Sequence, residues 1–332
     1  MKPENDVPYE NLTPDNILDA VESLGLLSDG RFLALNSYEN RVYQVGIEDS
    51  DPIIAKFYRP NRWIEDAIFE EHQFALDCVA QEIPVVAPIE INGTTLHNFS
   101  DYRFSLYTRH GGHAPNLDNP DHLEWLGRFI SRLHSVGSRF PFQHRLKLNP
   151  KTFGHDNLDF LIENNFIPDE LRHNYQLAAQ QVLEIIDQQF AAYNYLPSIR
   201  LHGDLHVGNI LWTDSGPHIV DLDDCMMGPA IQDIWMLLSG SDEEMVIQLS
   251  AILKGYNQFY DFDPISLNLV EALRSLRIIN YSAWLAKRWH DPTFPKNFSW
   301  FNEPRYWEEQ LYTLREQIER MQNSQLLRIF NQ

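Results

Sequence analysis

The sequence predicts an α+β fold in which a small antiparallel β-sheet precedes a larger, mostly helical part. Three observations support this prediction. Between residues 31 and 108, runs of β-branched and aromatic residues alternate with short polar turns, as strands do. From residue 119 onward, apolar residues recur instead at the spacing of helices. The length of 332 residues exceeds that of a usual single domain, so we expect two domains, 1–108 and 109–332.

Composition and charge exclude several classes of protein. The net charge is −21, from 26 Lys and Arg against 47 Asp and Glu, and a general nucleic-acid binder needs the opposite surplus to neutralise phosphates. No apolar run approaches the roughly 20 residues of a membrane span, and residues 1–6 contain no apolar signal segment. Cys78 and Cys225 are expected to be reduced thiols. We therefore expect a cytoplasmic monomer without nucleic-acid or membrane partners.

The elements of the predicted sheet region follow from local signals. Thr13 as N-cap, with Pro14 and Asp15 after it, predicts the start of a short helix. Strands are expected at 32–35, 41–45 and 53–58, a helix at about 63–81, and a hairpin at 94–99 and 102–107.

The remaining chain reads as helical. Helices are expected from Asn119, from Pro168 to about Tyr193, over 229–238, and near 242–259, 265–289 and 304–322. Residues 151–165 are weakly patterned, which is compatible with an irregular, substrate-facing insertion. Residues 294–298 look too exposed in character to assign.

The most informative stretch is RLHGDLHVGNILW at 200–212, followed by HIVDLDD at 218–224. It predicts two short strands around a polar loop, a hairpin that carries functional side chains at its tip. Asp204 and Asn209 have the D-x-x-x-x-N spacing of the catalytic loop of kinases, and Asp221 ends the next apolar run. Gly, Asp and Asn also populate ordinary turns, but the combination favours a site.

The residue types fit phosphoryl transfer, which depends on positioning and charge neutralisation. Asp204 is suited to orient the attacking hydroxyl and accept its proton. Mg²⁺ takes oxygen ligands, so Asn209 and Asp221 are suited to hold it. The sequence therefore predicts an enzyme that uses ATP and Mg²⁺, with Asp204 and Asp221 as catalytic residues and Asn209 and Asp221 as metal ligands. Whether Asp223 or Asp224 assists a second metal stays open.

Several motifs carry a family resemblance over residues 10–310. HGDLHVGNIL at 202–211 resembles the aminoglycoside phosphotransferase and choline kinase group, within the protein-kinase-like fold. More narrowly, the chain resembles the bacterial stress response kinase A family, through LNSYENRVYQ (35–44), AKFYRP (55–60), EEHQFAL (70–76), VDLDD (220–224) and DPTFPKNF (291–298). The resemblance implies a bilobal fold with a small sheet lobe and a large helical lobe. It also implies a bacterial stress-response kinase that phosphorylates Ser/Thr of proteins, itself included.

Lys56 and Glu71 are the predicted ion pair of the nucleotide site. Strand alternation turns Lys56 toward the same semi-buried face as Ile54 and Tyr58, where a lysine needs a carboxylate partner. Lys56 either snorkels from a sheet edge or is the lysine that contacts the α- and β-phosphates of the nucleotide. The resemblance favours Glu71 as its partner, with Glu70 as the close competitor.

The turn at 36–40 stands where protein kinases carry a glycine-rich phosphate loop, yet it has no glycine. Ser37 would then cover the phosphates, unless this is a plain β-turn. The hinge that holds adenine is expected at 107–110, with Tyr107 and Arg109 as nucleotide-binding residues. Asp233 is either a carboxylate that bonds the backbone of the 202–204 turn, as in this fold, or a simple helix-dipole acid.

Two other functions remain alternatives. The same loop serves small-molecule kinases, which act on an aminoglycoside, choline, homoserine or a sugar alcohol. A non-catalytic nucleotide-binding scaffold is the second alternative, although every expected polar group is present. No activation loop with an A-P-E ending follows Asp221, so we do not expect control by phosphorylation there.

Overall fold

The computed structural model describes residues 7–332, which divide into two compact units. The sheet unit contains the described chain up to Pro115, together with Phe142–Arg145 and Val207–Cys225. The helical unit contains the remaining segments, 116–141, 146–206 and 226–332. The prediction of a boundary at 108 did not include the two later segments of the sheet unit.

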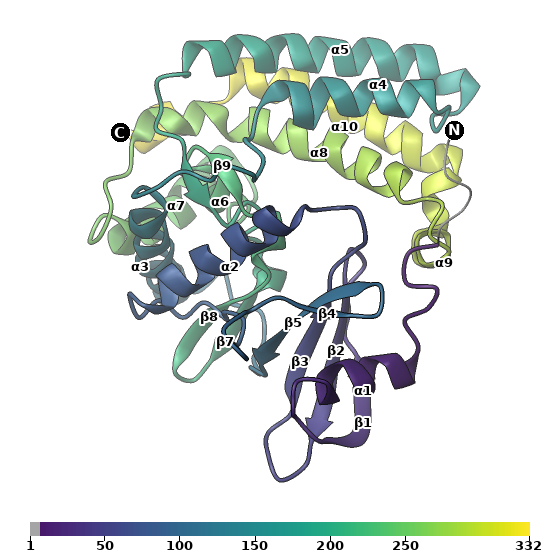
Figure 1. The fold of residues 1–332 in the computed structure, drawn as a ribbon. Helices are drawn as coiled ribbons and strands as arrows, with labels where there is room; N and C mark the ends of the chain where they lie inside the picture. Colours follow the sequence, from purple (N-terminus) through teal and green to yellow (C-terminus); the bar gives the residue numbers. More distant parts are fainter. Residues whose placement is uncertain (1–6) are drawn as a thin grey trace. The chain divides into compact units, whose positions relative to one another are not determined.

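The sheet unit is built on a five-stranded antiparallel sheet in the order β1-β2-β3-β5-β4 (Figure 1). The predicted elements are confirmed, including the helix capped by Thr13, whose hydroxyl accepts a hydrogen bond from the N–H of Asn16 at 3.2 Å. Ile17 and Val21 of α1 are buried in one core with Phe57 and Phe104 of the sheet. The elements are α1 (Pro14–Glu22), β1 (Ser28–Ala34), β2 (Arg41–Ile47), β3 (Ile53–Phe57), α2 (Glu65–Val79), β4 (His97–Phe99) and β5 (Tyr102–Thr108).

The segment 207–225 joins the sheet unit through a hairpin of β7 (Ile210–Thr213) and β8 (Gly216–Ile219). Ile219 bridges to the chain after α2, because its N–H donates to the carbonyl of Pro84 at 2.7 Å and its carbonyl accepts from Val86 at 2.9 Å. Short 3₁₀ turns, η2 (Val207–Asn209) and η3 (Leu222–Asp224), lie on either side of the hairpin in sequence.

The predicted pairing of the two strands around the polar loop is wrong. β6 (Ile199–Leu201) pairs with β9 (Met226–Gly228), whereas β7 pairs with β8. The reason is tertiary: β6 is buried within the helical unit, where the guanidinium of Arg200 donates to the carbonyl of Val136 at 3.0 Å.

In the helical unit, α4, α5, α8 and α10 run alongside one another (Figure 1). Their shared core includes Tyr175 and Trp307, whose ring centroids are 5.4 Å apart. The helices are α3 (Pro120–Gly137), η1 (Lys151–His155), α4 (Asp156–Glu163), α5 (Asp169–Ala192), α6 (Gln232–Trp235), α7 (Asp242–Tyr256), η4 (Pro264–Leu269), α8 (Val270–Lys287), α9 (Thr293–Asn297), η5 (Ser299–Asn302), α10 (Pro304–Asn323) and α11 (Leu326–Phe330).

Two predictions for this unit are wrong. Residues 151–163 are helical rather than irregular, because Leu158 and Leu161 are buried in the core that α8 shares. Residues 294–298 are not exposed in character, because Phe294 is fully buried and lies 5.0 Å from the ring of Trp284. The other predicted helices are confirmed, although the helix expected over 229–238 is only the short α6.

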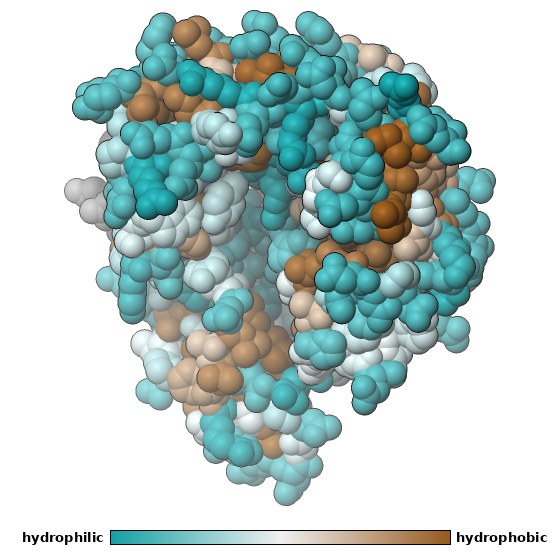
Figure 2. Space-filling view, turned by 180° about the vertical axis from the view of Figure 1, so that it is seen from behind, coloured by the Kyte–Doolittle hydropathy of each residue, from teal (hydrophilic) through white to brown (hydrophobic). Residues whose placement is uncertain are grey.

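The surface is mostly hydrophilic on the face shown in Figure 2, with hydrophobic residues gathered in a few patches. Cys78 and Cys225 are both buried, and they form no disulfide in the described part of the chain. Within residues 7–332, no helix has both the length and the apolar character needed to cross a membrane.

Candidate functional site

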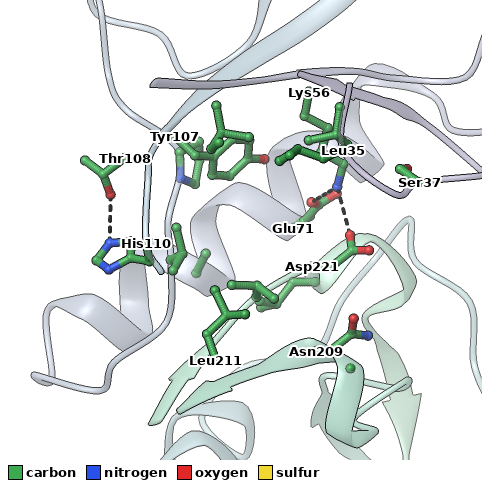
Figure 3. Close-up of a pocket in the computed structure, with 18 of the residues that line it drawn as sticks. Leu35, Ser37, Lys56, Glu71, Tyr107, Thr108, His110, Asn209, Leu211 and Asp221 are labelled. Atoms are coloured by element: carbon green, nitrogen blue, oxygen red, sulfur yellow. Dashed lines mark hydrogen bonds and ion pairs between the residues drawn. The ribbon is translucent and has the colours of Figure 1, made fainter. Parts of the chain in front are cut away.

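The sheet unit contains a cavity of about 360 Å³ between its sheet and the β7–β8 hairpin (Figure 3). Apolar side chains line it from both sides, with Val42 and Ile54 on the sheet and Leu211 and Val220 on the hairpin. Mostly apolar walls with a few polar groups that fix orientation are typical of small-molecule sites.

Lys56 forms the centre of the polar end of this cavity. Its ammonium Nζ lies 3.1 Å from Glu71 Oε1, 3.4 Å from Asp221 Oδ1 and 3.2 Å from Asp223 Oδ1. The predicted Lys56–Glu71 ion pair is therefore confirmed. Burial lowers the pKa of Lys56, but the carboxylates of Asp223 and Glu71 outweigh burial and hold that pKa above its ordinary value. Lys56 is a fixed positive charge at the cavity wall.

Glu70, the competitor for Lys56, has a different structural task. Its carboxylate accepts backbone N–H bonds from Gln143 (2.6 Å), His144 (2.9 Å) and Arg145 (3.1 Å). Partial burial raises the pKa of Glu70, but these three donors hold it below its ordinary value. Glu70 thus fastens the 142–145 segment to α2.

Arg145 completes the environment of Glu71. Its guanidinium donates to Glu71 Oε2 at 2.7 Å and to the carbonyl of Asp223 at 2.6 Å, so both oxygens of Glu71 are held by cations. Arg62 pairs with the carboxylates of both Asp223 and Asp224. Burial raises the pKa of Asp223, but Arg62, Lys56 and Arg145 together hold it well below its ordinary value. The prediction included neither arginine, because no local spacing points to a partner so distant in sequence.

Asp221 and Asn209 lie on the same side of the cavity in Figure 3. Asp221 has a φ of 61°, a left-handed conformation that a non-glycine residue adopts at a cost and that is common at functional positions. Its side chain is 54% exposed, whereas Lys56 beside it is 7% exposed. The segments that carry these residues are joined by a hydrogen bond of 3.0 Å from the N–H of Val220 to the carbonyl of Asn209.

This donor set fits a divalent cation that also binds phosphate. A carboxylate and an amide oxygen are the ligands that Mg²⁺ prefers, and it commonly takes the rest from substrate phosphates and water. Among residues 7–332, no group of three or more His, Cys, Asp or Glu side chains is arranged to hold a metal. Asn209 and Asp221 are the amide and the carboxylate that line this side of the cavity.

Tyr107, Thr108 and His110 lie on the opposite side of the cavity from Asp221 (Figure 3). The hydroxyl of Tyr107 lies 3.1 Å from that of Tyr58, and Thr108 bonds His110 at 3.0 Å. Arg109 is not among the residues that line the cavity. The reason is that its exposed guanidinium donates to the side chain of Gln44 on β2 at 2.8 Å.

Ser37 lines the cavity within the glycine-free turn. Its hydroxyl donates to the carbonyl of Asn40 at 3.0 Å, which tightens the turn. The side chain of Asn40 in turn accepts from the N–H of Arg59 at 3.1 Å. The turn is therefore held by side-chain hydrogen bonds.

In the helical unit, Asp233 holds the turn that carries Asp204. The two oxygens of Asp233 accept the N–H groups of His202 and Gly203, both at 2.8 Å. Gln232 donates to the carbonyl of Gly203 at 2.8 Å, and Gly203 has a φ of 85°, which glycine adopts without steric cost. Asp233 is therefore the backbone anchor that the sequence analysis considered, rather than a helix-dipole acid.

Asp204 itself pairs with Arg277 of α8 and lies 3.5 Å from Nε2 of His206. Burial raises its pKa, but Arg277 and His206 outweigh burial and hold the pKa of Asp204 below its ordinary value. A lowered pKa favours the ionised form of this carboxylate. Arg277 was not predicted, since it lies 73 residues away in sequence.

Comparisons with known proteins agree on the family. A model described as "Phosphotransferase enzyme family" matches residues 31–267. Stress response kinase A of Escherichia coli (strain K12) is 41% identical over 318 residues, which is 96% of each chain. Serine/threonine protein kinase RdoA of Salmonella typhimurium (strain LT2) is 41% identical over 314 residues, 95% of each chain.

Solved structures support the fold at lower identity. Amicoumacin kinase hAmiN, in complex with AMP-PNP, Ca²⁺ and Ami, aligns with a TM-score of 0.69 at 19% identity, covering 90% of this chain and 92% of that one. Spectinomycin phosphotransferase APH(9)-Ia, with ADP and spectinomycin, aligns with a TM-score of 0.63 at 15% identity, covering 91% and 98%. The predicted fold class is confirmed.

Proposed function

This chain belongs to the phosphotransferase enzyme family, and from that premise we propose that it is a Mg²⁺-dependent kinase that phosphorylates Ser and Thr side chains of proteins, its own chain included. ATP-dependent phosphoryl transfer follows from the family itself. The observation that carries the proposal is the polar end of the cavity, where Lys56 is paired with Glu71 beside Asp221. The names of the most similar relatives support a protein acceptor and a role in stress response.

The nucleotide would lie in the cavity of the sheet unit. Its adenine fits between the apolar walls and bonds the backbone near Tyr107, while the phosphates reach Lys56. Glu71 holds Lys56 in place, and Ser37 with its turn covers the phosphates. Asn209 and Asp221 would hold Mg²⁺, which when bound neutralises phosphate charge.

Asp204 is the residue that we assign to the acceptor hydroxyl. Its ionised carboxylate orients the Ser or Thr hydroxyl and takes the proton as the oxygen bonds to the γ-phosphorus. The bond from the γ-phosphorus to its bridging oxygen breaks, and ADP leaves with the electron pair. Asp233 acts only as a positioning residue, because it fixes the backbone of the turn before Asp204.

The test is phosphosite mapping by mass spectrometry. The purified protein is incubated with labelled ATP and Mg²⁺, alone, with myelin basic protein and with a panel of small alcohols. Wild type should place phosphate on Ser or Thr of protein, and Asp204→Ala should not. Label in a small alcohol, with all protein bands dark, would contradict the proposal.

That outcome would favour the alternative, a small-molecule hydroxyl kinase. One observation supports this alternative: the solved structures with the same fold include kinases of amicoumacin and spectinomycin. At 19% identity or less, these structures support the fold alone, so the acceptor is to be identified by experiment.

The metal assignment is tested separately. Mg-ATP should raise the melting temperature of wild type, because a ligand that binds only the folded state stabilises it. Asp221→Ala should lose most of that increase, whereas Asp214→Asn, an exposed carboxylate of the β7–β8 turn, should keep it. An unchanged increase in Asp221→Ala would remove Asp221 from the metal site.

A further inference from the structure

The helical unit has a cavity of its own, of about 380 Å³, beside the loop that carries Asp204. Its charged and titratable lining residues are Arg274, Arg277 and His206, and its aromatic ones are Trp235 and Tyr281. No acidic residue occurs among its lining residues, all of which belong to the described chain. Both arginines have carboxylate partners outside this lining, Glu271 for Arg274 and Asp204 for Arg277.

The two arginines differ in how firmly they are held. Arg274 lies 5.3 Å from the ring of Trp235 and 3.3 Å from the buried carboxylate of Glu271, and its side chain is 25% exposed. Arg277, one turn further along α8, is 42% exposed and pairs with Asp204. Arg274 is therefore part of the cavity wall, whereas Arg277 is the cation that a bound molecule can reach.

The pair of Asp204 with Arg277 has a consequence for the reaction. The guanidinium of Arg277 competes with an acceptor hydroxyl for the carboxylate of Asp204. A partly exposed ion pair exchanges more readily than a buried one when another anion is offered. An acceptor with its own carboxylate can take over Arg277 and leave Asp204 to the hydroxyl.

The same charges act against cationic acceptors. A polyamine-like molecule would place its ammonium groups beside two guanidinium groups, and like charges held close together are mutually repelled. Arginine also bonds carboxylates bidentately, which fixes the direction from which a substrate enters.

We propose that Arg277 is the specificity-determining residue of this kinase and binds an Asp or Glu side chain that flanks the phosphorylated Ser or Thr. The enzyme thus prefers acidic protein segments. This inference rests on the proposed function and adds the charge class of its acceptor.

The test uses Ser peptides in sets of three. The peptides of one set differ at a single position flanking the Ser, which is Glu, Gln or Lys, and each flanking position has its own set. Wild type should use the best Glu peptide with a kcat/KM about tenfold above the Gln peptide, as expected for a charged hydrogen bond, and should use the Lys peptide least. Arg277→Gln should lower the Glu peptide to the level of the Gln peptide. Arg277→Glu should favour the Lys peptide, and Arg277→Lys should restore part of the preference for Glu.

The matched control is Arg305→Gln, which removes an equal charge from α10, where the side chain is 83% exposed and pairs with Glu309. It should leave the peptide preference unchanged. Equal use of the three peptides by wild type, or a preference for Glu that survives Arg277→Gln, overturns the inference. A failure of the proposed function would give a different result. In that case no peptide would be labelled, whereas a small alcohol would be.

Discussion

The Lys56–Glu71 ion pair of the sheet unit and the Asp204–Arg277 ion pair of the helical unit differ in their burial. In the sheet unit, Lys56, Glu71 and Asp223 have side chains that are 7%, 4% and 4% exposed, and Arg62 and Arg145 close the cluster around them. In the helical unit, Asp204 and Arg277 are 25% and 42% exposed. A buried ion pair cannot exchange partners cheaply, because an unpaired charge in the interior costs several kcal/mol, whereas a half-exposed pair can.

This difference matches what phosphoryl transfer asks of each part. Phosphates are best stabilised by charges that are already fixed before the nucleotide arrives, because no reorganisation is then needed during the reaction. An acceptor must enter, react and leave, so its partner charges need to be replaceable. The most direct way to test this contrast is to remove one charge from each region and compare the losses.

The largest effect is expected for Asp204→Ala. Loss of the proton acceptor should lower kcat by about 10²–10⁴-fold, while the affinity for ATP changes little, because Asp204 is assigned to the hydroxyl and not to the phosphates. Steady-state kinetics and nucleotide titration measure the two quantities. Wild-type turnover in this variant would remove Asp204 from the reaction.

The next largest effect is expected for Glu71→Gln. It leaves Lys56 and Arg145 under-compensated in a buried cluster, so the free energy of unfolding should fall by about 3–5 kcal/mol. Urea denaturation measures this loss. Glu70→Gln is the matched control, because it keeps an oxygen for the N–H groups of residues 143–145 and should cost only about 1–2 kcal/mol. Equal losses of unfolding free energy in the two variants would mean that the deeper burial of Glu71 does not make it more important for stability than Glu70.

A smaller effect is expected for Asp233→Asn. An amide offers one oxygen to the N–H groups of His202 and Gly203, so one buried donor loses its partner at a cost of about 1–3 kcal/mol. The turn before Asp204 then shifts, and kcat should fall while KM for ATP stays near wild type. A parallel rise of KM for ATP would point instead to a general loss of structure.

The smallest effect is expected in the pH profile of Arg277→Gln. Arg277 and His206 hold the pKa of Asp204 below its ordinary value against the opposing effect of burial. Removing Arg277 should therefore raise this pKa, and because Asp204 must be ionised to accept a proton, the acidic limb of kcat/KM should move to higher pH. The profile is recorded with the Gln peptide and compared with Arg305→Gln. A limb that does not move would show that Arg277 leaves the ionisation of Asp204 unaffected.

Local patterns in the chain predicted most of the fold. The alternation around Lys56 indicated the sheet, and the apolar spacing of residues 63–81 indicated α2, whereas the choice of Glu71 over Glu70 came from the family resemblance. Thr13 and Asn119 marked helix starts, where their side chains accept from nearby N–H groups. These predictions hold because strand alternation, helix periodicity and capping depend on residues only a few positions apart.

Other features were fixed by contacts between distant segments. β6 pairs with β9 rather than with β7, and α4 forms where the pattern looked irregular, because in each case packing against other elements outweighs the local signal. The arginine partners of two carboxylates are also distant in sequence. Arg145 is 74 residues from Glu71, and Arg277 is 73 residues from Asp204.

The amino-acid sequence alone thus predicted most of the secondary structure and the family, and it named Lys56, Glu71, Asp204, Asn209 and Asp221 as candidate site residues. The folded chain was needed to show which cation faces which carboxylate. The physical reason is that paired charges can be far apart in sequence but must be close in space. The strength of a pair depends on its burial and on a separation of a few ångströms, and the spacing of residues along the chain determines neither quantity.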